Sequence, residues 1–216
     1  MKIILVACGT VSSIALETLR KEFPEVPIIG VVEPSCEKAV RLSKISGNRK
    51  IGVIGTAATV SVNAYGKYIS KHAGSDFEIY LKACPLFVPL VENGHIENGN
   101  ALTTLAAREY LSEFADMGLS NLILGCTHYP MIKDIIDAVV NPEGSEVRTA
   151  MIDVGFEAAH ALESIIISRN LANDRNRKGS IQVYLSDEGI NFGEIASSFL
   201  GVDIRGKSVK VDIEAN

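Results

Sequence analysis

The sequence SNLILGCTHYP, at residues 120–130, decides how the fold is interpreted. Its apolar first half suits a strand that is buried on both faces, as the strands of parallel sheets are. The apolar run ends at Gly125, and three polar or reactive residues follow at once: Cys126, Thr127 and His128. The stretch therefore predicts a strand that delivers a thiol at its carboxyl end.

A second stretch with the same plan opens the chain. Residues 2–13 read KIILVACGTVSS, in which an apolar run is followed by Cys8, Gly9 and Thr10 and then by a segment of helical period. In open α/β sheets, ligands bind beyond the carboxyl ends of the strands, where helix N-termini present unpaired N–H groups. Such a site suits a small anionic substrate. We expect the helix dipole to stabilise a thiolate there, so that it can act as a base or nucleophile near neutral pH.

Strand and helix patterns alternate along most of the chain. Apolar runs at residues 28–32 and 51–54 predict further buried strands, residues 57–72 have the spacing of a helix, and residues 77–83 are expected to form the next strand. This βαβα order predicts mostly parallel sheets with right-handed crossovers, and the two cysteine units indicate two similar α/β halves. The other expected elements are a short helix that delivers Glu92, helices at 33–42, 100–117, 130–140, 155–167 and 190–200, and strands at 149–152, 180–185 and 207–213.

The composition limits the class of protein. The 216 residues are 47% hydrophobic and 22% charged, which is typical of a soluble globular protein. A formal net charge of -5 argues against nonspecific binding of nucleic acids. No apolar run reaches the roughly 18 residues of a transmembrane helix, and the run before Cys8 is too short for a signal peptide, so we expect neither membrane insertion nor export. The four cysteines include no CxxC pair, which disfavours a zinc site and fits a reduced, cytoplasmic setting.

Three kinds of chemistry use cysteine in such a place. Acyl transfer needs a histidine base, and since His128 is only two residues from Cys126, their side chains need not converge. Thiol redox exchange would favour a CxxC pair or a resolving cysteine nearby. Proton transfer explains the duplication better, because inverting a stereocentre at Cα needs one acid–base group on each face. Two cysteine units can supply both groups without a metal or a pyridoxal cofactor.

Each of these residues also has an ordinary structural interpretation, which spacing alone leaves open. A cysteine between a strand and a helix is often a small buried hydrophobe, and we assign Cys36 and Cys84 to that class. Thr56 and Thr59 can cap a helix. The remaining structural alternatives are His128 as a packing residue, Glu92 as a solvated carboxylate, and Asp153 as an N-cap.

Several segments carry a resemblance to a known family. LILGCTHYP at 122–130 and the threonine-rich VIGTAATVSVNAY at 53–65 are the strongest. The others are ACGTVSS at 7–13, IIGVVEP at 28–34, ACPLFVPLVENG at 83–94, and the weaker YLSD at 184–187 with FLG at 199–201. On these motifs the chain closely resembles the glutamate racemases of the cofactor-independent aspartate/glutamate racemase superfamily.

The resemblance implies an isomerase that interconverts L-glutamate and D-glutamate in the cytoplasm, with no cofactor and no metal, and supplies D-glutamate for bacterial peptidoglycan and hence for cell shape. It implies that Cys8 and Cys126 are acid–base thiols, one serving each enantiomer, and that His128 assists the second thiol. The substrate-binding positions that it implies are Gly9, Thr10, Thr56, Thr59, Glu92 and Thr127. Glutamate is the expected partner, nucleic acid and membrane are not, and a homodimer is left open.

The resemblance also implies an architecture. Family members have two similar three-layer α/β domains with mostly parallel sheets, and the active site lies in the cleft between them. In this chain, residues 1–32 plus 147–216 would form the first domain and residues 33–146 the inserted second domain. Gly9 stands where many members have asparagine. The Asp-Ser-Gly and Pro-Tyr-Gly segments with which the family begins are absent, so the first domain is expected to be truncated.

Two alternatives to a glutamate racemase follow from these departures. One is a catalytically inactive, truncated remnant of such an enzyme. The other is a related racemase or isomerase that acts on another small carboxylic acid.

Overall fold

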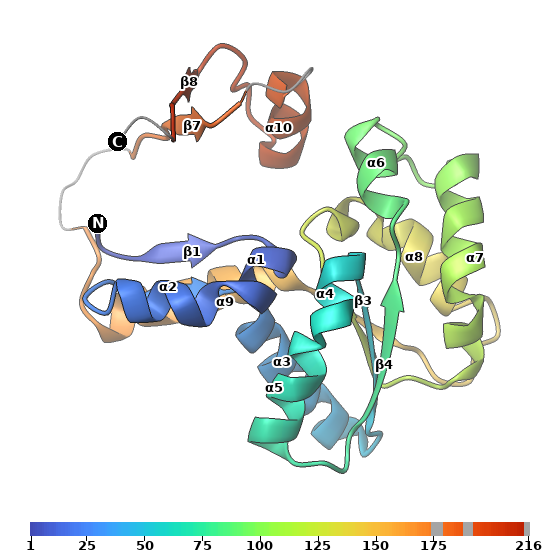
Figure 1. Cartoon of the computed structure of the whole chain (residues 1–216). Coiled ribbons are helices and arrows are strands. Elements are labelled where there is room, and N and C mark those ends of the chain that lie inside the picture. The colour runs from blue at the N-terminus through green and yellow to red at the C-terminus, as the bar shows by residue number, and fades with distance from the viewer. Residues whose placement is uncertain (174–178, 188–191, 214–216) are drawn as a thin grey trace. The chain divides into compact units, whose positions relative to one another are not determined.

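A parallel sheet of four strands forms the centre of the first of two units into which the chain divides, residues 1–172 and 173–216. The computed structural model describes residues 1–173, 179–187 and 192–213 (Figure 1). The strand order is β4-β3-β5-β6, and the strands are β3 (Lys50–Gly55), β4 (Glu78–Ala83), β5 (Asn121–Leu124) and β6 (Ala150–Asp153). Each neighbouring pair is parallel, as the alternation of strands and helices predicted.

The apolar run of β5 is continuous because both of its faces are covered. Successive side chains of a strand point to opposite faces of the sheet. Leu122 and Leu124 therefore pack into the hydrophobic cluster on one face, and Ile123 packs into the cluster on the other face. All three side chains are fully buried, which confirms the strand predicted from the run at 120–130.

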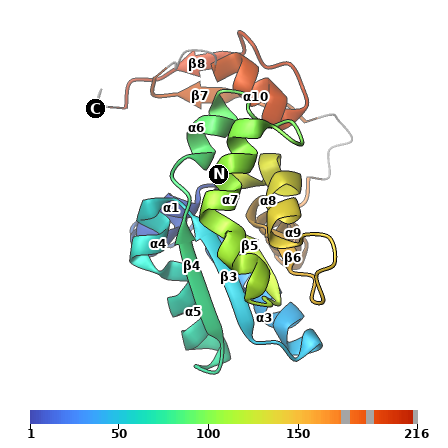
Figure 2. The same cartoon turned by 90° about the vertical axis from the view of Figure 1, so that its right-hand side faces the viewer.

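Helices cover both faces of this sheet, so the first unit contains a three-layer arrangement. The helices on the first face are α6 (Phe87–Glu92), α7 (Ala101–Asp116) and α8 (Lys133–Val140). Those on the second face are α3 (Val32–Ser46), α5 (Ala64–Ala73) and α9 (Val154–Ser168). Figure 2 looks onto the face with α7 and α8, and Figure 1 shows α3 and α5 on the opposite side of β3 and β4.

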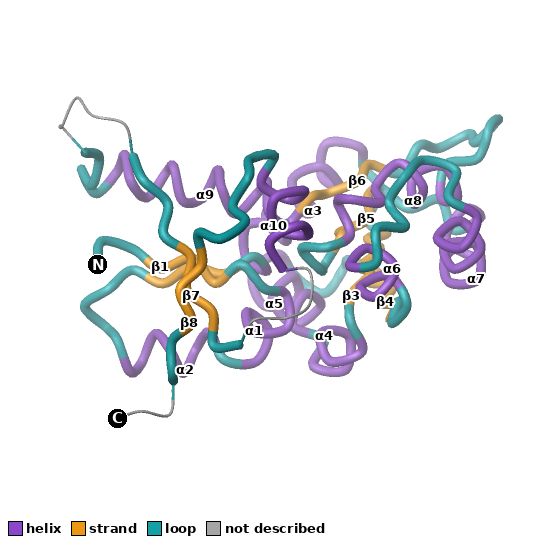
Figure 3. The backbone as a smooth tube through the Cα atoms, turned by 90° about the horizontal axis from the view of Figure 1, so that it is seen from above, coloured by secondary structure: helices purple, strands orange, loops and turns teal. Residues whose placement is uncertain are grey.

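The strand that leads to Cys8 lies in a separate sheet of two parallel strands, β1 (Ile4–Val6) and β2 (Ile28–Gly30). The helices α1 (Gly9–Ile14) and α2 (Leu16–Glu22) connect them. In the view of Figure 3, β1 lies between α2 and α9. Arg20 of α2 donates two hydrogen bonds to Glu33, at 2.6 and 2.7 Å, and this bidentate pair ties α2 to the first turn of α3.

Several boundaries differ from the expected ones, and three of these differences have a clear local cause or position. The helix expected at 57–72 is two helices, α4 (Ala57–Val62) and α5, because Asn63 has a left-handed backbone with φ of 52°. Asparagine tolerates that conformation better than most residues do. The helix expected at 130–140 begins with a 3-10 turn, η1 (Tyr129–Ile132), before α8. The strand expected at 28–32 ends at Gly30, since α3 already begins at Val32.

The second unit contains β7 (Val183–Leu185), α10 (Phe192–Leu200) and β8 (Ser208–Lys210). The two strands are parallel, with Tyr184 opposite Val209. The strands expected at 180–185 and 207–213 are therefore present, although both are shorter. Of the helix expected at 190–200, residues 190 and 191 lie outside the described residues.

The predicted division into residues 1–32 plus 147–216 and residues 33–146 stays a prediction. Within the first unit, β6 pairs with β5, although that division assigns these two strands to different domains. Among the helices of the described residues, none has the length and apolar character needed to cross a membrane.

Candidate active site

The two cysteine-bearing loops meet where Gly9 faces Gly125. A Cβ atom added to Gly9 would lie 2.1 Å from the carbonyl oxygen of Gly125, far inside any ordinary contact. Only glycine permits the backbones to approach so closely. Gly9 follows Cys8, and Gly125 precedes Cys126, so the contact joins a loop of the two-stranded sheet to a loop of the four-stranded sheet.

Three threonine hydroxyls form a cluster beside this contact. The Oγ1 atom of Thr10 lies 3.0 Å from that of Thr56 and 3.3 Å from that of Thr59, and the last two are 3.1 Å apart. Thr56 also caps α4, since its hydroxyl accepts a hydrogen bond from the backbone N–H of Thr59 at 3.3 Å. The capping role and the site role are therefore compatible, because one hydroxyl can do both.

Cys126, His128 and Glu92 form a chain of polar contacts. The Sγ atom of Cys126 lies 3.7 Å from Nδ1 of His128, and Nε2 of His128 lies 3.2 Å from Oε1 of Glu92. Glu92 is the last residue of α6, which confirms the short helix expected to deliver it. The sequence left open whether the thiol and the imidazole converge, and the turn after β5 folds His128 back toward Cys126.

The pKa of the Cys126 thiol is raised, chiefly because the side chain is buried. A hydrogen bond from the backbone N–H of His128 opposes this shift, and negative charge on Cys8 or Glu92 adds to it. The sequence predicted the opposite direction, from a helix dipole. The prediction is wrong because burial outweighs the backbone N–H of His128, and because a turn and the 3-10 helix η1, rather than an α-helix N-terminus, follow Cys126.

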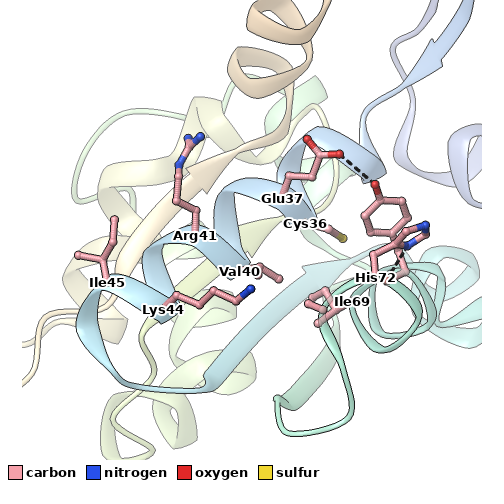
Figure 4. A pocket seen from close by; sticks show the side chains of 10 residues that line it. Cys36, Glu37, Val40, Arg41, Lys44, Ile45, Ile69 and His72 are labelled. Carbon is pink, nitrogen blue, oxygen red and sulfur yellow. Dashed lines mark hydrogen bonds between the residues drawn. The ribbon is translucent and has the colours of Figure 1, made fainter.

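The other two cysteines are buried and stand apart from these contacts, as expected. Burial raises the pKa of Cys36 well above its ordinary value and that of Cys84 to about 12. Cys36 lines a hollow of about 440 Å³ between α3 and α5 (Figure 4). The residues that line this hollow include none of the predicted site residues.

The structure also locates Thr127, Tyr65 and Asp153. Thr127 is half-buried, and its hydroxyl has no hydrogen-bond partner among the described residues. Tyr65, which sequence reasoning did not single out, donates a hydrogen bond from its hydroxyl to the carbonyl oxygen of Gly125 at 3.4 Å. The only signal for it was its place at the end of the threonine-rich segment 53–65. Asp153 is the N-cap of α9, which is the structural alternative given for it from the sequence. Its carboxylate accepts hydrogen bonds from the backbone N–H groups of Gly155 and Phe156.

Among the described residues, no three or more histidine, cysteine, aspartate or glutamate side chains are arranged to hold a metal ion.

Comparison with known proteins places this α/β protein in a family. Residues 1–162 match the model of the Asp/Glu/Hydantoin racemase family. A glutamate racemase of Sulfurihydrogenibium sp. (strain YO3AOP1) is 40% identical over 208 residues, which are 96% of this chain and 72% of that relative. The chain therefore belongs to the Asp/Glu/Hydantoin racemase family, and its class of enzyme is the isomerases.

Solved structures agree with this placement. The structure of glutamate racemase from Francisella tularensis in complex with D-glutamate has a TM-score of 0.86 and 30% identity, and the match covers 100% of this chain and 75% of that one. The structure from Thermus thermophilus in complex with beta-chloro-D-alanine has a TM-score of 0.80 and 35% identity, with 99% and 73% covered. The α/β fold with parallel sheets is thus shared with glutamate racemases.

Proposed function

We propose that this chain is a glutamate racemase that interconverts L-glutamate and D-glutamate by proton transfer at Cα between two thiols. The observation that carries the proposal is the contact between Gly9 and Gly125, because it brings the loops of Cys8 and Cys126 together from separate sheets. Negative charge on Cys8 also contributes to the raised pKa of Cys126. The relatives named above support glutamate as the substrate.

The proposed reaction is balanced by the two cysteines alone. The thiolate of one cysteine removes the proton from Cα, and the thiol of the other donates a proton to the opposite face of the resulting carbanion. The substrate leaves with the opposite configuration, and the protonation states of the two thiols are exchanged. Cys8 and Cys126 reset by exchanging protons with other groups or with water, so the reaction needs no redox partner and no cofactor.

The remaining residues bind substrate and prepare the second thiol. The hydroxyls of Thr10, Thr56 and Thr59, together with that of Thr127, are donors that can hold the carboxylates of glutamate. His128 exchanges protons with Cys126, while Glu92 orients the imidazole through its contact with Nε2.

One observation favours a second chemistry. A thiol, an imidazole and a carboxylate in line are also the arrangement of a cysteine nucleophile with its base and orienting group, as used in acyl transfer. That function predicts a thioester on Cys126 when the protein is incubated with activated acyl substrates. Proton transfer predicts no such adduct, and mass spectrometry of the intact protein separates the two.

The biological role that we propose follows from the reaction. D-glutamate made in the cytoplasm would supply peptidoglycan synthesis in a bacterial cell. The partner required is the small-molecule substrate, and a homodimer is left open.

Turnover and proton exchange test the proposal directly. Circular dichroism should show loss of optical activity starting from either enantiomer of glutamate. In heavy water, NMR should show deuterium entering at Cα. The variant Cys84→Ala, which removes a thiol outside the site, serves as the control and should retain both signals.

The alternatives give different results in the same assay. A folded protein that neither racemises glutamate nor exchanges its Cα proton would support the inactive remnant. Turnover of aspartate or another small carboxylic acid, with glutamate left unchanged, would support a related racemase of different specificity.

A further inference from the structure

A tyrosine that the proposed reaction does not use lies against the second thiol loop. Tyr65 is the second residue of α5 and is 1% exposed. Its hydroxyl donates to the carbonyl oxygen of Gly125 at 3.4 Å. Its ring lies beneath the same residue, since a Cβ added to Gly125 would be 3.3 Å from Cε2 and from the hydroxyl oxygen of Tyr65.

Two contacts hold the carbonyl of Gly125, and a third holds its N–H group. Tyr65 reaches its oxygen from α5, and Gly9 packs against it from the loop of Cys8. The N–H of Gly125 donates to the carbonyl oxygen of Ile54 at 2.7 Å, which continues the ladder of β3 and β5 for one more residue. The carbonyl of residue 125 and the nitrogen of Cys126 belong to one planar peptide unit, so the position of that oxygen determines where Cys126 begins.

Tyr65 is itself held by packing between α3 and α5. The Sγ atom of Cys36 lies 3.7 Å from the backbone carbonyl oxygen of Tyr65 and donates to it. Figure 4 shows Cys36 and Val40 of α3 facing Ile69 of α5, where these side chains line the hollow between the two helices. Ile69 is also 1% exposed, so the part of α5 that carries Tyr65 is buried in the cluster that it shares with α3.

The hydroxyl of Tyr65 stays protonated and so remains a donor. Burial is the main reason that its pKa is raised well above the ordinary value for tyrosine, and charges on Cys36, Cys126 and Cys8 raise it further.

We infer that Tyr65 is a positioning residue: through the Gly125 carbonyl it holds the Cys126 loop in register with the Cys8 loop, so that the two thiols face a substrate together. This inference deepens the proposed racemase function and rests on it for its effect on turnover. Its effect on the reactivity of the Cys126 thiol does not depend on any substrate.

The variant Tyr65→Phe tests the inference, because it keeps the ring and removes only the hydroxyl. Tyr68→Phe is the matched control, since Tyr68 lies one turn along the same helix and bonds Glu37 through its hydroxyl. We expect Tyr65→Phe to lower kcat for glutamate by ~10-fold with KM changed less than about twofold, because misplacement of a reacting group costs rate rather than binding. Tyr68→Phe should have the same kcat and KM for glutamate as the unaltered protein.

A second measurement works without turnover. The rate at which iodoacetamide alkylates Cys126 is measured against pH by mass spectrometry of peptides, with Cys8 as the internal reference. Tyr65→Phe should shift the profile of Cys126 relative to that of Cys8, and Tyr68→Phe should not. If the shift occurs but neither protein racemises glutamate, the proposed function fails and the positioning role stands.

Unchanged kcat together with an unchanged Cys126 profile in a folded Tyr65→Phe protein would overturn the inference. Thermal unfolding followed by circular dichroism establishes whether the variant is folded. If it is not, Gly9→Ala displaces the Gly125 carbonyl from the opposite side and should produce the same shift in the Cys126 profile. An unchanged profile in that variant would count equally against the inference.

Discussion

Cys126 and Cys8 occupy the same place in two similar motifs, yet their surroundings differ. Cys126 follows β5, which has a neighbouring strand on each side, and it is 8% exposed. Cys8 follows β1, which pairs in the described residues with β2 alone, and it is half-buried. His128 and Glu92 extend from the thiol of Cys126, whereas the thiol of Cys8 makes no hydrogen bond within the described residues. The position of a strand in its sheet, more than the motif, sets the environment of the thiol.

The largest expected effect comes from removing either thiol. We predict that Cys126→Ala and Cys8→Ala each lower the racemisation of glutamate by about 10²–10⁴-fold, because each loses one acid–base group. In heavy water, each variant should still exchange the Cα proton of one enantiomer, and the two variants should act on opposite enantiomers. NMR of separate L- and D-glutamate samples measures this, and exchange of the same enantiomer by both variants would contradict a two-sided site.

The second-largest effect is expected from changing the contact between Gly9 and Gly125, which joins the Cys8 loop to the Cys126 loop. Gly9→Ala places a Cβ 2.1 Å from the Gly125 carbonyl oxygen, so the two loops must separate. We predict a loss of racemisation of up to about 10²-fold and a fall in the free energy of unfolding of about 1–3 kcal/mol. Gly9→Asn introduces the residue that many members of the family carry at this position. It should lower racemisation and stability in the same way, because its Cβ meets the same carbonyl oxygen.

Urea unfolding and circular dichroism assays measure both effects. The control is Gly179→Ala, where an added Cβ meets nothing within 4 Å. Full activity and stability in Gly9→Ala would show that the loops do not need this close approach.

A smaller effect is expected from the groups that distinguish Cys126 from Cys8. We predict that His128→Asn lowers racemisation by about 10-fold, since it removes a proton-transfer partner. Glu92→Gln should lower racemisation by a smaller factor than His128→Asn does. It also removes a negative charge that raises the pKa of Cys126. The midpoint of the alkylation profile of Cys126 should therefore move to lower pH in Glu92→Gln, while that of Cys8 stays in place. A move to higher pH would show that Glu92 acts on the thiol in another way.

The smallest effect comes from a cysteine that belongs to neither loop. Burial raises the pKa of Cys84 from 9.0 to about 12, so the folded state holds the thiol proton more tightly than the unfolded state. This contribution to stability is fully present below pH 9 and is lost as the pH rises toward 12. Cys84→Ala should therefore weaken the dependence of the free energy of unfolding on pH in this window, as urea titrations can measure. An unchanged dependence would mean that Cys84 does not contribute.

Much of the fold could be predicted from the sequence because the apolar residues that are buried in strands and helices recur at a regular spacing along the chain. The apolar run before Gly125 predicted β5, and its continuity predicted helices on both faces of the sheet. The motifs also singled out Thr56 and Glu92. The structure brings Thr56 next to Thr10 and Glu92 next to His128. The division of the helix at Asn63 was missed, because one residue in a left-handed conformation interrupts a helix without disturbing its apolar period.

The sequence by itself determined the alternation of strands and helices, the family, and the two loops that carry Cys8 and Cys126. These features depend on local spacing and composition. Only the tertiary structure decided that Gly9 packs against Gly125, that His128 turns back to Cys126, and that Tyr65 supports the same loop. It also decided the direction of the pKa shift of Cys126, since burial by distant segments outweighs the local backbone. Contacts between residues far apart in the chain leave no period in the sequence, and that is why they could not be predicted from it.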